Sequence, residues 1–154
     1  STLHTNDAPS TVTRMIDMGV EPFLISSSVI ASISQRLARK LCEECKRPYD
    51  PPRDQLLGLG FDPDAPENQD VVFYRGEGCP NCRNTGYRGR IGMFELMVMN
   101  QEIRELVVRR ASADQIKEAA LANGMVTLAM DALDKAMRGI TDIDEILRVV
   151  STVR

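Results

Sequence analysis

The stretches Cys42-Glu43-Glu44-Cys45 and Cys79-Pro80-Asn81-Cys82 decide how this chain folds. Each is a C-x2-C element, and together they account for all four cysteines of the sequence. Two such elements supply four thiolates, which is the complete tetrahedral ligand set of a structural zinc site. The predicted ligands of Zn²⁺ are therefore Cys42, Cys45, Cys79 and Cys82. Because four protein ligands leave no open position for water or substrate, we expect this zinc to be structural and not catalytic.

Two disulfides or a redox dithiol are the competing interpretations of the cysteines. Disulfides persist in oxidising compartments, and the sequence shows no signal peptide that points to export. A thioredoxin-type centre uses one C-x2-C at the start of a helix, whereas here the element is doubled. Residues 46–78, between the two pairs, form a longer insert than a zinc ribbon usually has, so this segment needs structure of its own.

The segment before the first cysteine predicts a mixture of strands and helices. Asp7 can cap a helix, Pro9 suits its first turn, and Gly19 can end it. The apolar residues of segment 29–41 fit a helical stripe as well as strand alternation, and we favour the strand. The expected elements are the end of a strand at residues 1–5, helices at 8–18 and 22–28, and a strand at 29–41.

The remainder of the chain predicts two strands and a helical last third. Asn100 and Thr141 can cap helices, and Ser112-x-x-Gln115 is a capping box. The expected helices have apolar stripes that are typical of core packing in a small bundle. They lie at residues 54–59, 101–110, 113–122, 125–138 and 142–150, and the expected strands lie at 71–74 and 87–99.

The composition of the chain argues against several classes of protein. The 154 residues include 19 basic and 22 acidic ones, with a formal net charge of -3, which argues against a protein whose main task is to coat nucleic acid. A hydrophobic content of 43% supports a folded core, and no run of about 20 apolar residues could span a membrane. The phosphate-binding motif G-x-x-x-x-G-K-[ST] and the usual hydrolase motifs are absent, so the chain has no complete catalytic centre of its own.

Single polar residues suggest weaker hypotheses. His4, the only histidine, follows the first expected strand, where a side chain can face a ligand at a sheet edge, although such a histidine is more often a plain surface or core residue. Several arginines could pair with phosphate oxygens, but solvated faces or salt bridges are the expected role of most. These are Arg14, Arg36, Arg39, Arg83, Arg88 and Arg90.

Several motifs, in order, resemble the traffic ATPases that drive type II secretion and type IV pilus assembly. Ser1-Thr2-Leu3-His4-Thr5-Asn6-Asp7-Ala8 is similar to the His box of these proteins. The segments that continue the resemblance are 14–24, 35–42, the cysteine pairs and 86–95. The similarity covers essentially the whole chain and is to the C-terminal portion of the family.

The resemblance implies an α/β fold: the tail of a RecA-like P-loop ATPase sheet at residues 1–41, a tetracysteine zinc subdomain at 42–99 and a helical subdomain at 100–154. It implies that His4 is a catalytic residue near the γ-phosphate. It also implies nucleotide or subunit-interface contacts for Arg14 and Arg36, and metal binding by the four cysteines. The P-loop and the acidic motifs that hold Mg²⁺ would lie before Ser1, so we expect the chain alone neither to bind nor to hydrolyse ATP.

The resemblance further implies a homo-hexamer that works in the cytoplasm. The motor would associate with the inner membrane through a platform protein, without spanning the membrane and without nucleic acid. The absence of an initial methionine suggests that the chain is a portion of a longer protein. A zinc-ribbon nucleic-acid-binding module is the alternative, since Arg83, Arg88 and Arg90 follow the second cysteine pair. A salt-dependent DNA titration would favour that alternative.

Overall fold

The computed structural model describes residues 1–151, which form seven α-helices and four β-strands in a mixed α/β fold. The chain divides into two compact units. Unit 1 comprises residues 1–35 and 94–128, and unit 2 comprises residues 36–93 and the described part of 129–152. The boundary between the units falls within two long strands.

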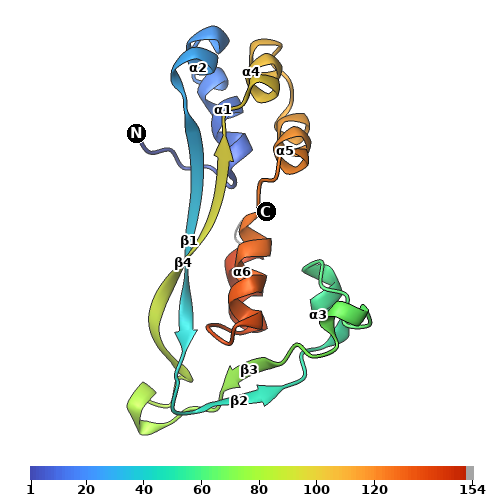
Figure 1. The fold of residues 1–154 in the computed structure, drawn as a ribbon. Coiled ribbons are helices and arrows are strands. Elements are labelled where there is room, and N and C mark those ends of the chain that lie inside the picture. The colour runs from blue at the N-terminus through green and yellow to red at the C-terminus, as the bar shows by residue number, and fades with distance from the viewer. Residues whose placement is uncertain (152–154) are drawn as a thin grey trace. The chain divides into compact units, whose positions relative to one another are not determined.

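The strands form two small sheets of two strands each. They are β1 (Ala31–Leu41), β2 (Lys46–Tyr49), β3 (Phe73–Gly76) and β4 (Tyr87–Val98). β1 pairs with β4, and Figure 1 shows these two strands side by side and running in opposite directions. β2 pairs with β3 in antiparallel register, with Lys46 opposite Gly76 and Tyr49 opposite Phe73. The strands expected at 29–41 and 87–99 are confirmed.

Unit 1 packs four helices around one apolar core. They are α1 (Ala8–Asp17), α2 (Pro22–Ser28), α4 (Gln101–Val108) and α5 (Ala113–Ala122). The side chain of Asp7 caps α1 by accepting the N–H of Ser10 at 2.8 Å, as the sequence predicts. The buried core consists of Ala8, Val12, Ile25, Met97, Met99, Ile103, Val107, Ile116, Ala119, Ala120 and Met125.

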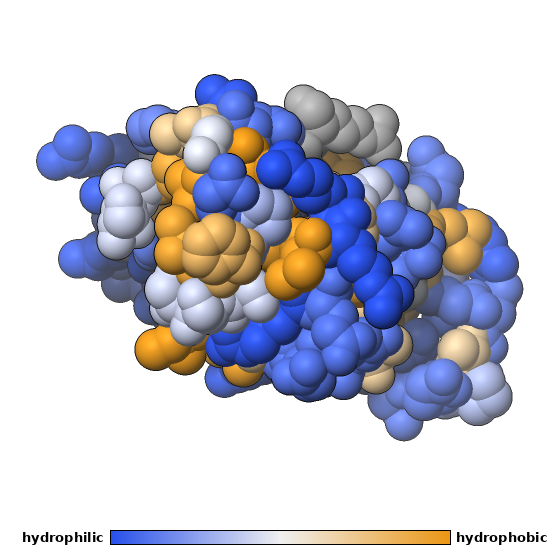
Figure 2. Space-filling view, turned by 90° about the horizontal axis from the view of Figure 1, so that it is seen from above, coloured by the Kyte–Doolittle hydropathy of each residue, from blue (hydrophilic) through white to orange (hydrophobic). Residues whose placement is uncertain are grey.

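Apolar side chains are also exposed at the end of unit 1 where α2 and α4 lie. Phe23 and Leu24 on α2 and Val108 on α4 are among the exposed large hydrophobic residues. Figure 2, which looks down on this end, shows hydrophobic surface gathered among hydrophilic side chains. A shallow hollow there is lined by Ser26, Gln101, Arg104, Glu105, Val108 and Arg109.

Unit 2 contains α3 (Arg53–Gly58), most of α6 (Leu128–Met137), and α7 (Ile143–Ser151). Two short 3₁₀ helices, Pro66–Asn68 and Pro80–Cys82, lie between β2 and β4. The buried apolar side chains of this unit include Ala38, Leu41, Leu56, Phe61, Phe73, Met93, Ala132, Ala136, Ile143, Ile146 and Val149.

A buried carboxylate fastens α7 to β1 in unit 2. Glu145 is 1% exposed and accepts hydrogen bonds from the backbone and guanidinium of Arg39 and from the guanidinium of Arg148. The guanidinium of Arg39 lies 4.0 Å from the ring centre of Tyr87, whose hydroxyl donates to Asp142 at 2.7 Å. The network therefore joins residues of β1, β4 and α7.

The paired strands β1 and β4 form a two-stranded ribbon, the β1–β4 ribbon. In its unit 1 part burial is reversed: polar side chains are buried and apolar side chains are exposed. Ser34 and Glu95 are buried, at 7% and 3% exposure, while Ile33 is 64% exposed. Along β4, Met97 is fully buried and its neighbour Leu96 is 48% exposed. Because successive side chains of a strand point to opposite faces, one face of the ribbon is covered and partly polar, and the other is apolar and exposed.

The structure corrects three expectations. Residues 1–5 are not a strand, because no strand of the described residues pairs with them. The cap of α7 is Asp142 instead of Thr141: Asp142 accepts the N–H of Glu145, whereas the hydroxyl of Thr141 donates to the carbonyl of Arg39. β2 is a strand that the sequence did not predict. Within residues 1–151, no helix combines the length and the apolar character that crossing a bilayer requires.

Candidate metal centre

The four cysteines lie on two turns that flank the β2–β3 ladder. Cys42 and Cys45 lie between β1 and β2, and Cys79 and Cys82 lie at the 3₁₀ turn after β3. Since the ladder pairs Lys46 with Gly76, it brings the residue after Cys45 close to the chain that enters the second turn. The predicted insert between the cysteine pairs thus has its own structure, and that structure aligns the pairs.

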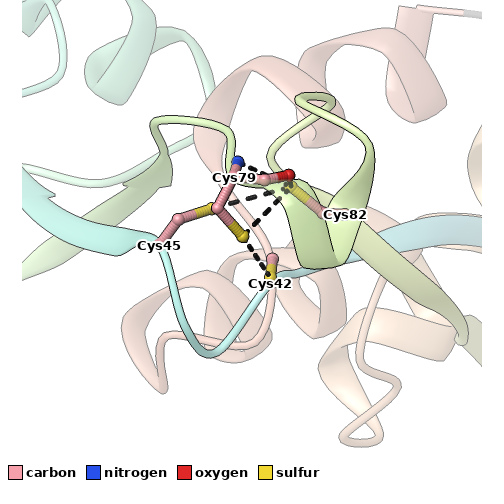
Figure 3. A group of neighbouring side chains, drawn as sticks. All are labelled: Cys42, Cys45, Cys79 and Cys82. Carbon is pink, nitrogen blue, oxygen red and sulfur yellow. Dashed lines mark hydrogen bonds between the residues drawn. The ribbon is translucent and has the colours of Figure 1, made fainter.

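The sulfur atoms converge on one point, as Figure 3 shows. All four Sγ atoms lie within 4.8 Å of one another. The Sγ–Sγ distances are 3.8 Å for Cys42–Cys79, 3.8 Å for Cys45–Cys82 and 3.7 Å for Cys79–Cys82. A tetrahedron with Zn–S bonds of about 2.3 Å has edges of about 3.8 Å. The sulfur spacing therefore fits a four-thiolate metal site.

Backbone N–H groups point at the sulfurs. Cys82 Sγ accepts from the N–H groups of Cys79 and Gly86, each at 3.2 Å, and Cys45 Sγ accepts from Gly78 at 3.3 Å. Burial raises the pKa of Cys82, but these two N–H groups outweigh it and lower the pKa to about 6. Burial raises the pKa of Cys45 to about 11. Donors of this kind stabilise thiolates, which are the form that binds metal.

Two glycines let the chain close tightly at the base of the second cysteine turn. A Cβ on Gly76 would lie 2.2 Å from the carbonyl oxygen of Gly86, and one on Gly86 would lie 2.7 Å from that of Gly76. Gly86 also has a φ of 79° and its carbonyl accepts the N–H of Cys42 at 2.9 Å. Any side chain at either glycine would push apart the two segments that enter and leave the second cysteine turn.

The centre can hold a metal ion. Cys42, Cys45 and Cys82 are buried, and Cys79 is half-buried. All four donors are cysteine sulfurs, which as thiolates form a set that suits zinc or iron and not hard cations such as Mg²⁺. With every ligand position filled by protein, a bound ion would cross-link the two turns.

The structure gathers the four predicted metal ligands but not the other candidate residues. His4 is exposed on the N-terminal segment, and Arg14 is exposed on α1. Arg36 is half-buried on β1. Their roles towards nucleotide stay predictions. Arg39, by contrast, forms a salt bridge with Glu145, and salt bridges or solvated faces were the expected role of most arginines.

The roles of some residues that shape the structure were not predicted from the sequence. Gly76 and Gly86 flank the second cysteine pair, and their position beside Cys79-Pro80-Asn81-Cys82 was the available signal. Glu95 is buried and accepts backbone N–H groups from Ala8 and Leu128. Only the three-dimensional fold reveals that contact.

Comparison with known proteins identifies the family. Residues 1–148 match the family described as type II/IV secretion system protein. The chain is 47% identical over 147 residues to the type IV pilus assembly ATPase PilB of Thermus thermophilus, covering 96% of this chain and 16% of that protein. It is 42% identical over 149 residues to the type II secretion system ATPase E of Vibrio cholerae, covering 97% of this chain and 29% of that protein.

A third relative gives the same result. The type II secretion system protein E of Pseudomonas aeruginosa is 41% identical over 149 residues, with 97% of this chain and 29% of that protein covered. The chain thus spans less than a third of the length of these relatives. The resemblance inferred from the motifs is confirmed, and the chain belongs to the type II/IV secretion system protein family.

Proposed function

We propose that this chain is the C-terminal portion of a hexameric motor ATPase that powers type II secretion or type IV pilus assembly. The motor would work in the cytoplasm and meet the inner membrane through a platform protein. The names of the relatives support this role. Since the chain spans only a small part of their length, the remainder of the motor would be supplied by the rest of a longer protein.

The structural observation that carries the proposal is the reversed burial of the β1–β4 ribbon. Strands that are covered on both faces are typical of the central sheets of α/β proteins. Here one face already packs in unit 1, while the other exposes Ile33, Phe94, Leu96 and Val98. Apolar surface of this kind marks an interface. It supports a ribbon that belongs to a larger, RecA-like sheet in residues 1–41 and their partner strands.

Nucleotide chemistry would be shared between this chain and the rest of the motor. The sequence has no P-loop, so the backbone amides, the lysine and the Mg²⁺ ligands that hold the phosphates of ATP would come from elsewhere. His4 would face the γ-phosphate, and its exposed position on the segment before α1 supports access to a ligand. Arg14 and Arg36 would contact nucleotide or a neighbouring subunit.

The cysteine centre would bind structural zinc within a subdomain of residues 42–99. Bound zinc would fix the two turns, and the charge of four thiolates would be offset in part by Lys46 and Arg47, which follow Cys45. A turn stiffened in this way could act as an arm that carries motion to the platform protein. Residues 100–154 would form the helical subdomain that follows.

The test compares ATP turnover by the chain and by the intact ATPase. We expect the purified chain to show no turnover above a buffer blank, and the intact protein to hydrolyse ATP. His4→Ala in the intact protein should lower kcat at least about tenfold, since a group that acts at the transferred phosphate contributes to the barrier itself. Glu118→Gln, on the exposed side of α5, is the control and should keep full activity. Turnover by the chain alone, or full activity of His4→Ala, would contradict the proposal.

A further inference from the structure

One buried carboxylate in unit 1 holds the first residues of two helices. Glu95 lies on β4 and is 3% exposed. Its Oε1 accepts the N–H of Ala8, the first residue of α1, at 2.8 Å, and its Oε2 accepts the N–H of Leu128, the first residue of α6, at 3.1 Å. Each carboxylate oxygen therefore serves a different helix.

The helix starts explain why a carboxyl side chain is accommodated at this buried position. The first N–H groups of a helix have no partner within the helix, and its N-terminus carries a partial positive charge. Two such ends on one carboxylate satisfy both of its oxygens. Ala8 is fully buried and Leu128 is 5% exposed, so water is a poor substitute for Glu95 at either N–H.

Only Thr5, Asn6 and Asp7 separate His4 from the first residue of α1, so the position of this helix limits where His4 can lie. Asp7 caps α1 through Ser10, and its carboxylate lies 3.7 Å from Nζ of Lys117 on α5. The segment carrying His4 is thus fixed at its helical end by Asp7 and Glu95.

We propose that Glu95 is a positioning residue that couples the segment carrying His4 to the start of α6. A shift of Leu128 would displace the carboxylate that also orients the N-terminus of α1. A shift of α1 would displace the same carboxylate and thereby affect Leu128. α6 starts in unit 1 and continues into unit 2, so its first residue is where a displacement of that helix would reach Glu95. The consequence for ATP hydrolysis rests on the function proposed above; the coupling itself does not.

The first experiment follows His4 by NMR in the labelled 154-residue chain, where a single histidine gives a single imidazole signal. Glu95→Gln keeps one acceptor oxygen but turns an NH₂ group towards the other N–H. We expect at least tenfold faster amide exchange at Ala8 or Leu128 and a sharper, more mobile His4 signal. Exchange at the core amides of Ile103 and Ile116 should change much less. Glu118→Gln should match the wild type.

Two outcomes would overturn the proposal. One is a Glu95→Gln variant in which His4 and the amides of Ala8 and Leu128 are unchanged. The other is an equal rise of exchange at Ile103 and Ile116, which would mean that Glu95 contributes only general stability. ATP is absent from this experiment, so its result is independent of whether the chain belongs to a working motor.

The second experiment tests the coupling without changing Glu95. Leu128→Pro removes the N–H that Glu95 accepts, at a helix position that tolerates proline, and Leu128→Ala removes the side chain but keeps the N–H. We expect Leu128→Pro to change the amide signal of Ala8 and the mobility of His4 beyond the effect of Leu128→Ala. This extra effect should vanish when Glu95→Gln is also present. Equal effects of the two Leu128 variants, or an extra effect that persists without Glu95, would refute the coupling.

Discussion

Arg39 and Glu145 are joined by three hydrogen bonds. The backbone N–H of Arg39 donates to Oε1 of Glu145 at 2.8 Å, and its guanidinium donates to Oε2 at 2.8 and 3.1 Å. One carboxylate thus satisfies both the main chain of β1 and a side chain on it. This geometry makes the pair a far stronger contact than an ordinary surface salt bridge.

Removal of this carboxylate should be costly. Glu145→Ala leaves the N–H of Arg39 and two half-exposed guanidinium groups without their acceptor, and we expect a loss of about 1–3 kcal/mol of unfolding free energy. Urea unfolding followed by circular dichroism measures it. Asp134→Ala, which removes the exposed ion pair with Arg138, is the control and should change stability by less than about 1 kcal/mol. If Glu145→Ala and Asp134→Ala change stability equally, the Glu145 network contributes no more than an exposed ion pair.

The same carboxylate predicts a dependence on pH. Burial raises the pKa of Glu145, but hydrogen bonds from Arg148 and Arg39 outweigh it and lower the pKa to about 2. An unfolded glutamate titrates near pH 4.3, so the stabilisation is complete above about pH 5 and is lost as the pH falls towards 2. The lost free energy should be about 2–3 kcal/mol.

Urea unfolding of wild type and Glu145→Gln from about pH 6 to pH 3 provides the measurement. The difference in stability between the two proteins should shrink as the pH falls. Asp142, whose pKa is raised by burial, is present in both proteins, so its own titration largely cancels in the difference. A difference that stays constant with pH would contradict the low pKa of Glu145.

Metal content tests the cysteine centre. Native mass spectrometry should find a single zinc ion per chain, and a strong chelator should remove it and expose residues 42–86 to proteolysis, since the ion cross-links the two turns. Cys82→Ser should lose the ion. Glu44→Gln changes an exposed residue of the first turn and should keep it. Purified chain that is stable, protease-resistant and metal-free would rule out a structural role for zinc.

Substitutions at two neighbouring residues of β4 test whether one face of the β1–β4 ribbon is covered and the other exposed. Met97→Thr affects the covered face and should cost about 2–4 kcal/mol, whereas Leu96→Thr on the exposed face should cost less than about 0.5 kcal/mol in this chain. In the intact protein, Leu96→Thr should become destabilising by about 1–2 kcal/mol because that face would be buried. Thermal or urea unfolding distinguishes these cases. If Leu96→Thr is as harmful as Met97→Thr in the chain alone, that face is already covered within the chain, and if it costs nothing in the intact protein, the face is not an interface.

A matched pair of glycines tests the close contact between the segments that enter and leave the second cysteine turn. Gly76→Ala would place Cβ against the backbone of Gly86 and should destabilise the protein by at least about 2 kcal/mol, with weaker metal retention. Gly58, at the end of α3, has open space around it, and Gly58→Ala should stabilise by about 0.5–1 kcal/mol. Both are measured by urea unfolding with metal analysis. Similar stability of the two variants would refute the steric argument.

Most of the fold that could be predicted from sequence was predicted from residues only a few positions apart. Asp7 caps α1, and Ser112 with Gln115 forms the predicted capping box of α5. These signals work because donor and acceptor are three residues apart in the chain. The spacing of the cysteines worked for a similar reason, since each pair forms a single turn.

Features that depend on distant partners could not be predicted. β2 contains Lys46, Arg47, Pro48 and Tyr49, a run without apolar alternation that becomes a strand only by pairing with β3. Glu95 bonds with a residue 87 positions away, and no local pattern indicates that destination. The prediction of a strand at residues 1–5 was wrong because strand-like sequence forms a strand only where a partner strand is available.

The insert between the cysteine turns leaves from and returns to a single pair of opposed residues, Lys46 and Gly76. The exposed part of the insert can therefore be lengthened, shortened or exchanged without altering the sulfur positions, whereas Leu56 and Phe61 belong to the buried core. Residues 62–70, at the far side of this excursion, are accordingly a permissive place to splice in an affinity tag or a fluorescent reporter. A label there would follow the cysteine region in a working assembly while leaving its ligands untouched.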